Sequence, residues 1–174
     1  MGLALLLAGC GYHLRGTQGV TAALPPLHLG GDRSIPLYEI LRRALEETGT
    51  PLVARESAQL VLVLLGEQRD RRVLSVAATG TEVQEYELIY SATFEAYDAA
   101  GRPLLTPQTV RRTRDIRFDK TAVNTLVSES EQLYRDMRLA AGREILRRLQ
   151  AAAQGLEAAG GTPGEKVGEK AGAP

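Results

Sequence analysis

The chain has 174 residues, which is enough for one ordinary domain with a tail. Its 21 basic and 21 acidic residues balance, and this argues against a general nucleic-acid binder, which needs a basic excess to neutralise phosphates. One cysteine and two histidines exclude an internal disulfide and a cysteine-cluster metal site, and they argue against a histidine-rich one.

The first informative stretch is Leu7-Ala8-Gly9-Cys10, which ends at the single cysteine. An uncharged start, the apolar run Leu3–Leu7 and the small residues after it indicate a secretion signal over residues 1–9 that is cleaved before Cys10. The thiol of such a site takes a diacylglycerol thioether and the freed amine takes an acyl chain, so we expect lipid attachment at Cys10. Because the apolar run is short, we expect the natural signal to begin further upstream. The alternative is a buried free cysteine.

The next elements are a lead segment, a short strand and a helix. Residues 10–26 are mostly small and polar. Leu27-His28-Leu29 predicts a strand that stops at Gly30-Gly31-Asp32. Apolar residues then recur at helical spacing over residues 36–48, with Ser34 as the expected N-cap.

Three long strands are predicted in the middle of the chain. The apolar run Leu60–Leu65 predicts a buried strand that continues to about Val76. Glu87–Tyr97 alternates apolar and polar residues, which is typical of a strand with one buried face. Asp98–Pro103 has the composition of a hairpin turn, and Leu104–Phe118 returns as an antiparallel partner.

An apolar stripe from about Thr125 to Gln150 predicts a long amphipathic helix. From residue 155 onward, Gly, Ala, Glu, Lys and Pro dominate without apolar periodicity, so we expect residues 155–174 to form a disordered tail. Two amphipathic helices can cover one face of a mainly antiparallel sheet. The predicted fold of residues 27–154 is therefore a two-layer α+β sandwich.

The sequence contains no convincing catalytic or metal-binding motif. Neither histidine lies in a motif, and Gly30-Gly31-Asp32 lacks the glycine spacing of a phosphate-binding loop. The acidic residues Glu82, Glu85 and Glu87 are more typical of a solvated strand face than of a metal site. We therefore expect a protein that is not an enzyme and holds no metal.

Basic residues gather on two of the predicted strands: Arg69, Arg71 and Arg72 on one, and Arg111, Arg112, Arg114 and Arg117 on the other. Guanidinium groups bind phosphate in bidentate geometry, so this surface suits an anionic glycolipid or another phosphate-rich ligand. The alternative is that the arginines protect strand edges or pair with glutamates across the sheet, among Glu82, Glu85, Glu87 and Glu95. Because successive strand residues alternate between faces, Arg112 and Arg114 share one face and Arg111 and Arg117 share the other.

The stretch L-A-G-C-G-Y-H-L-R-G, Leu7 to Gly16, resembles the start of the LptE family, the lipopolysaccharide-assembly lipoproteins of Gram-negative bacteria. In that family the lipidated cysteine is followed by glycine, an aromatic residue and His-Leu-Arg, here Gly11 to Arg15. The order of elements also matches over roughly residues 10–150, including Gly80 to Tyr86 and the long final helix. The tail is not covered.

This resemblance implies two helices on a four-stranded sheet and a role without catalysis. The lipoprotein would plug the outer-membrane β-barrel LptD, help it to assemble and take part in inserting lipopolysaccharide into the outer leaflet. The covalent N-acyl and S-diacylglycerol lipid on Cys10 would hold it on the periplasmic side of the outer membrane, and no other cofactor is implied. Gly11 favours that location, because aspartate after the cysteine is the usual signal for inner-membrane retention.

Family members have been proposed to bind lipopolysaccharide through basic residues at a sheet loop and near the start of the last helix. Here those places read Ala77-Ala78-Thr79-Gly80 and Ser128, so the nearby candidates are Arg69 to Arg72 and Lys120. Two other functions remain open from the residues alone. One is a stand-alone lipid-anchored periplasmic protein that binds saccharide or peptidoglycan, and the other, ranked last, is a lipid-anchored hydrolase.

Overall fold

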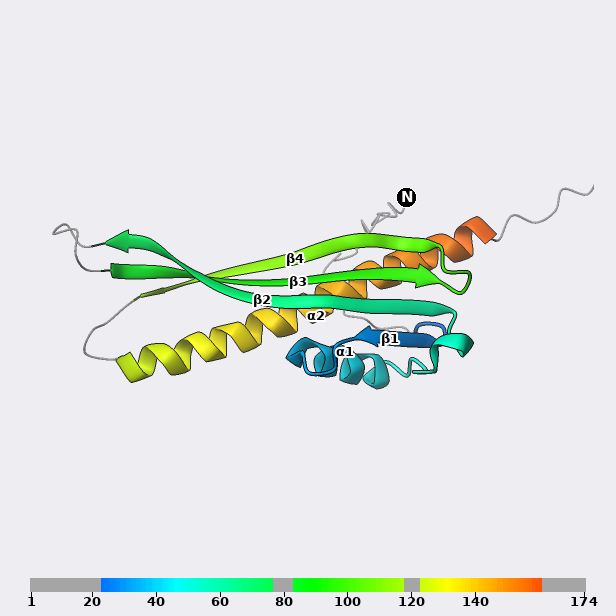
Figure 1. Ribbon diagram of the computed structural model, residues 1–174, viewed down its shortest axis with the longest axis horizontal. Helices are drawn as coiled ribbons and strands as arrows, with labels where there is room; N and C mark the ends of the chain where they lie inside the picture. Colours follow the sequence, from blue (N-terminus) through cyan, green and yellow to red (C-terminus); the bar gives the residue numbers. More distant parts are fainter. Residues whose placement is uncertain (1–22, 77–82, 118–122, 161–174) are drawn as a thin grey trace, which may run out of the picture.

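The computed structural model describes residues 23–76, 83–117 and 123–160 (Figure 1). One sheet contains β1 (Leu27–Gly31), β2 (Leu60–Val76), β3 (Val83–Asp98) and β4 (Pro103–Arg117), in that spatial order. β1 runs parallel to β2, and the other two pairings are antiparallel. The helices are α1 (Pro36–Glu47) and α2 (Val123–Gly160), with a short 3-10 turn at Arg55–Ser57. The predicted α+β fold and its mainly antiparallel sheet are confirmed.

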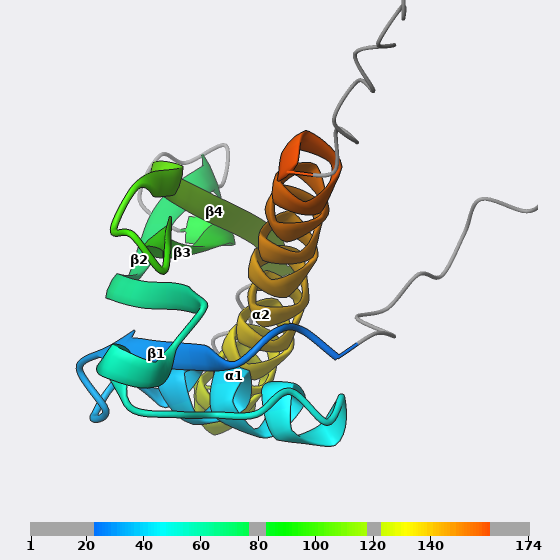
Figure 2. The same cartoon turned by 90° about the vertical axis from the view of Figure 1, so that its right-hand side faces the viewer.

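Both helices share one apolar core with one face of the sheet. Viewed along the long axis, α2 runs beside the sheet while α1 lies next to β1 (Figure 2). The largest fully buried side chains come from both helices and from β1, β2 and β3: Leu27, Leu37, Leu41, Leu45, Leu62, Leu88, Tyr90, Phe94, Met137, Ile145, Leu146 and Leu149. Gly142 allows the helices to approach closely, because a Cβ there would lie 3.3 Å from Ile40 Cγ2. No helix in the described part of the chain has the length and apolar character needed to cross a membrane.

A β-bulge in β2 changes which residues face the helices. Leu62 pairs with Ala96 and Leu64 with Phe94 on the core face, and the register then shifts between Leu64 and Gly66. Because a bulge adds one residue to one strand, side chains beyond it alternate in the opposite phase. From Glu67 to Val73 the odd-numbered residues of β2 therefore face α2, which places Arg69 and Arg71 on the helix side.

The predicted strand stop at Gly30-Gly31 is wrong, because both glycines belong to β1. Gly31 has a φ of 120°, and a Cβ there would lie only 2.4 Å from the carbonyl oxygen of Leu64. Such a φ is readily available only to glycine. Gly31 therefore allows close pairing with β2, and the strand ends at this residue.

The predicted N-cap at Ser34 is also wrong. Ile35 occupies the N-cap position without a side-chain hydrogen bond, and the backbone N–H of Ser34 donates to Asp32 Oδ1 at 2.8 Å. A residue from the sheet takes over part of the capping role, since the N–H of Leu37 donates to Glu67 Oε2 at 3.2 Å. One free N–H at the helix start is thus satisfied from β2.

The last helix continues to Gly160, past its predicted end near Gln150. The start of the predicted disordered tail is therefore wrong for residues 155–160, which are helical. Alanine has the highest helix propensity, so an alanine-rich segment can extend a helix without an apolar stripe. Residues 161–174, like the signal and most of the lead segment over residues 1–22, lie outside the described residues.

A candidate ligand-binding cleft between α2 and the long strands

A cleft of about 490 Å³ lies between the N-terminal half of α2, the C-terminal half of β2 and the N-terminal half of β3. The strands contribute Arg69, Asp70, Arg71 and Leu88, and the helix contributes Leu126, Val127, Ser130, Glu131 and Tyr134. We call this the distal cleft. It brings two of the predicted basic residues onto the same wall, next to apolar side chains from α2.

Apolar side chains are exposed at this end of the molecule. Val127 is 60% exposed on the first turns of α2, and Val73, Leu74 and Val76 are 41–51% exposed at the end of β2. The end of β2 and the start of α2 lie at the same end of the protein (Figure 1). Cationic and apolar surfaces are therefore close together, an arrangement that suits an anionic amphiphile.

Arg69 is held in the wall of the cleft by residues of α2. Its guanidinium forms an ion pair with Glu131 and lies 4.0 Å from the centre of the Tyr134 ring. The Tyr134 hydroxyl donates to the Asp70 carbonyl at 2.6 Å, and the bond from Arg69 lowers the pKa of Glu131 below its usual value. Arg69 therefore joins the two walls, and its own charge is largely matched by Glu131.

Arg71 and Arg114 form a row with Leu88 across three strands. Arg71 pairs with Leu88 in one register and Leu88 pairs with Arg114 in the other, so all three side chains lie on the helix side. The Arg71 guanidinium stacks 4.4 Å from the Tyr86 ring, and Arg114 Nη1 donates to the Thr113 carbonyl at 2.9 Å. Within the described part of the chain, neither arginine has a carboxylate partner.

The other predicted arginines are divided between the two faces. Arg112 is on the helix side, with its Nη2 3.8 Å from Glu144 Oε2. On the opposite face, Arg72 pairs with Glu87 at 2.6 Å and Arg117 pairs with Glu85 at 3.4 Å. Arg111 is exposed on that face, opposite Ser91.

The two strand clusters are therefore not one continuous surface. For Arg72 and Arg117 the structure shows the cross-strand pairing with glutamate that was the alternative to ligand binding. Cys10 and Lys120 lie outside the described residues, as does Glu82. No group of metal-ligating side chains occurs within the described ranges.

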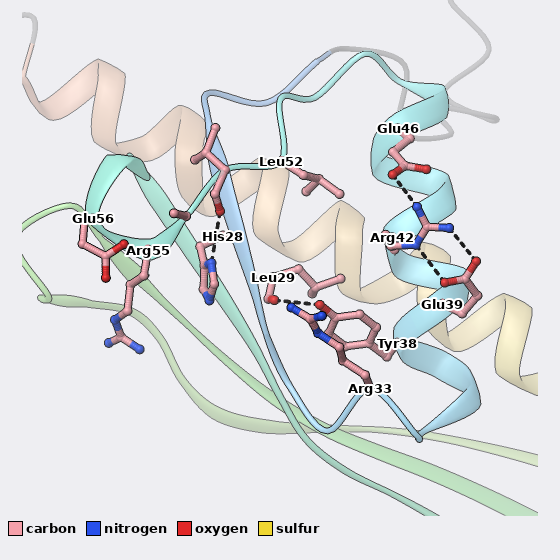
Figure 3. Close-up of a pocket in the computed structure, with 12 residues that line it drawn as sticks. His28, Leu29, Arg33, Tyr38, Glu39, Arg42, Glu46, Leu52, Arg55 and Glu56 are labelled. Atoms are coloured by element: carbon pink, nitrogen blue, oxygen red, sulfur yellow. Dashed lines mark hydrogen bonds and ion pairs between the residues drawn. The ribbon is translucent and has the colours of Figure 1, made fainter.

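A second groove, of about 750 Å³, lies between β1, α1 and residues 52–56 (Figure 3). Its polar groups largely bind each other. Arg42 bonds both Glu39 and Glu46, and Tyr38 donates to the Leu29 carbonyl at 3.0 Å. His28 Nδ1 lies 3.1 Å from the Val53 carbonyl, which can only accept, so Nδ1 carries a proton. None of the predicted basic residues lines this groove, so the distal cleft is the candidate site.

The model of the lipopolysaccharide-assembly family LptE matches residues 26–149, which include both walls of the distal cleft. The chain belongs to the LptE family. The "LPS-assembly lipoprotein LptE" of Photorhabdus laumondii is 30% identical over 155 residues, covering 86% of this chain and 82% of that protein.

Two solved lipoproteins share the fold. The rare lipoprotein B of Shewanella oneidensis is 28% identical with a TM-score of 0.69, over 76% of this chain and 98% of that one. A lipoprotein B of Nitrosomonas europaea is 25% identical with a TM-score of 0.70, over 91% of this chain and 97% of that one. The LptE-family fold therefore extends over the helices and strands that form the distal cleft.

Proposed function

We propose that this protein is an outer-membrane lipoprotein, anchored through acylated Cys10, that plugs the LptD β-barrel and helps to insert lipopolysaccharide. Membership of a family of lipopolysaccharide-assembly lipoproteins supports this role. The periplasmic location, the LptD partner and the lack of catalysis are further parts of the proposal. They rest on the resemblance of the N-terminal motif to that of the family.

The distal cleft is the proposed binding site for lipopolysaccharide, and the row Arg71–Leu88–Arg114 carries this proposal. Its two arginines lack carboxylate partners in the described chain and stand on either side of an apolar residue. Guanidinium groups bind phosphate in bidentate geometry, and the exposed valines and leucine nearby offer apolar surface to acyl chains. A phosphorylated glycolipid presents both kinds of group.

Matched double variants test this site. Arg71→Gln with Arg114→Gln removes the two cations beside the cleft, whereas Arg111→Gln with Arg117→Gln removes the same charge from the opposite face. Because a charge-assisted hydrogen bond contributes about 1.5–3 kcal/mol, the first variant should bind lipopolysaccharide at least about tenfold more weakly. The second should bind nearly as the parent does.

The assay is the binding of purified lipopolysaccharide to each folded variant, with circular dichroism as the check on folding. Equal losses in the two double variants would mean that net charge, and not the cleft, governs binding. Parent-like binding by both would remove the cleft from the proposal.

The barrel partnership needs a separate experiment. The full lipidated protein, purified from membranes in detergent, should retain LptD, identified by mass spectrometry. Cys10→Ala should leave unprocessed precursor or release a soluble domain. Recovery of the lipoprotein without a barrel would favour the stand-alone binder of saccharide or peptidoglycan, and an unmodified Cys10 by intact mass would refute the anchor.

A further inference from the structure

Three arginines converge on one carboxylate where α2 packs against β4. Glu144 is nearly buried, with 12% of its side chain exposed. Arg148 Nε donates to its Oε1 at 2.8 Å, while Arg147 pairs with its Oε2 and Arg112 reaches the same oxygen from β4. We call these four residues the Glu144 cluster. It lies on the helix side of the sheet but shares no residue with the distal cleft.

The Glu144 cluster carries more positive charge than its own structure neutralises. Three guanidinium groups face one carboxylate, and among the described residues the only further side-chain acceptor is neutral: Arg148 Nη1 donates to Gln108 Oε1 at 3.0 Å. Arg112 Nη1 also donates to the Arg111 carbonyl at 3.3 Å. Each guanidinium has five N–H donors, so most of the donors still have no acceptor within the described ranges. The arginine side chains remain between 35% and 61% exposed, and their free donors can therefore be reached from solvent.

We propose that the Glu144 cluster docks an acidic segment of a protein partner. A carboxylate from that segment would take up the donors that Glu144 leaves free and form a second, charge-assisted arginine–carboxylate pairing. This inference goes beyond the proposed function, and it does not depend on lipopolysaccharide binding in the distal cleft.

The surroundings favour a protein carboxylate over a lipid head group. Of the six large apolar side chains exposed in the described part of the chain, four lie at the end that holds the distal cleft, namely Val73, Leu74, Val76 and Val127. The polar residues Gln108 and Arg143 lie next to the cluster along β4 and α2. A lipid bound here would hold its acyl chains over a charged surface. β4 is also the terminal strand of the sheet, so a partner segment can approach from that side without displacing another strand.

Substitution of Glu144 should strengthen binding of an acidic segment, whereas substitution of an arginine in the cluster should weaken it. Glu144 gathers the three arginines, but its negative charge also competes with any anion that approaches them. Replacing Glu144 with glutamine removes the competitor and keeps the side-chain shape. If the cluster is a docking site, Glu144→Gln should bind an acidic segment more tightly than Glu47→Gln does, which removes the same charge from an exposed position on α1. Equal gains in the two variants would mean that net charge alone governs binding.

The test uses the full mature protein in detergent and a fluorescent aspartate-rich peptide, followed by anisotropy, with the matching asparagine peptide as the control ligand. Arg147→Gln should weaken binding by about tenfold, the effect of losing one charge-assisted contact. Arg143→Gln is the matched control, because Arg143 is exposed on the same helix, loses the same charge and has no ion-pair partner in the described chain. It should bind as the parent does.

The remaining outcomes each decide the inference. Equal losses in Arg147→Gln and Arg143→Gln, or equal binding of the asparagine peptide, would overturn it. So would binding of inorganic phosphate or phosphatidylglycerol vesicles that depends on Arg147 while the aspartate peptide fails to bind. Should Glu144→Gln fail to fold by circular dichroism, the Arg147–Arg143 comparison still decides.

Discussion

Glu67 and Arg138 form a buried ion pair that joins β2 to both helices. Arg138 donates to Glu67 Oε1 through Nη2 at 2.6 Å and through Nε at 2.9 Å. The other oxygen of Glu67 accepts the N–H of Leu37 at the start of α1. With 8% and 12% of the two side chains exposed, this pair orients both helices on the sheet from within the core.

Breaking this pair from one side should be costly, because an unpaired charge is then left in a desolvated place. We expect Arg138→Gln to lower the free energy of unfolding by about 3 kcal/mol, measured by urea denaturation. Glu67→Leu combined with Arg138→Met removes both charges and should recover much of that loss. Arg135→Gln, at an exposed position one turn earlier, should have little effect. A full-sized loss in the double variant would mean that Glu67 acts mainly through its bond to Leu37.

Gly31→Ala should destabilise the protein by about 2 kcal/mol or more, since a positive φ is strained for alanine and the new Cβ would meet the Leu64 carbonyl. Gly66→Ala is the control, because a Cβ at Gly66 would meet nothing within 4 Å. Thermal unfolding of the two variants makes the comparison. Equal stability would show that β1 moves away from β2 at little cost.

Acid should remove the contribution of Glu39. Its hydrogen bonds with Arg42, and then with Arg43, lower the pKa of Glu39 from 4.5 to about 2. A carboxyl group with a lower pKa in the folded state binds fewer protons there, so its stabilisation is present above about pH 4.5 and is lost as the pH falls towards 2.

Urea denaturation of the parent and Glu39→Gln across this pH range provides the measurement. The difference in unfolding free energy between the two proteins should shrink as the pH falls from 4.5 towards 2. Glu47→Gln is the control on the same helix, because Glu47 has no ion pair among the described residues. A parent–Glu39→Gln difference that stays constant down to the lowest pH would show that the bonds to Arg42 and Arg43 contribute nothing.

Periodicity alone predicted the long strands and both helices, because burial of one face leaves a repeat in the sequence that does not depend on the partner. It could not predict which way Arg69 and Arg71 point. The bulge at Leu64–Gly66 changes the phase of β2. Gly66 and the change from apolar to charged residues after Leu65 coincide with it, but a glycine in a strand does not by itself fix the register. The alternation along β4 contains no such change between Val110 and Ile116, so the division of Arg111 and Arg117 from Arg112 and Arg114 was predicted correctly.

For a related reason, the sequence predicted only the strand side of the distal cleft. Its strand arginines stand out by charge, whereas Glu131 and Tyr134 are ordinary residues of an amphipathic helix until that helix is placed on β2. The same holds for the Glu67–Arg138 pair and the Glu144 cluster, whose members are distant in sequence. Such contacts depend on how α2 crosses the sheet, which helical periodicity does not determine.

The last helix should tolerate removal of its end but not of its final buried turn. Leu149 is fully buried and Ala153 nearly so, whereas Gly155 is exposed and a Cβ there would meet nothing within 4 Å. A chain that ends at Gln154 should therefore unfold at the parent's temperature and still complement a deletion strain. A chain that ends at Leu146 loses the buried Leu149 side chain, worth about 1.5–3 kcal/mol, and should unfold earlier. Thermal unfolding of the two truncations separates these expectations. A lowered midpoint for the chain ending at Gln154 would show that residues beyond it pack against the domain.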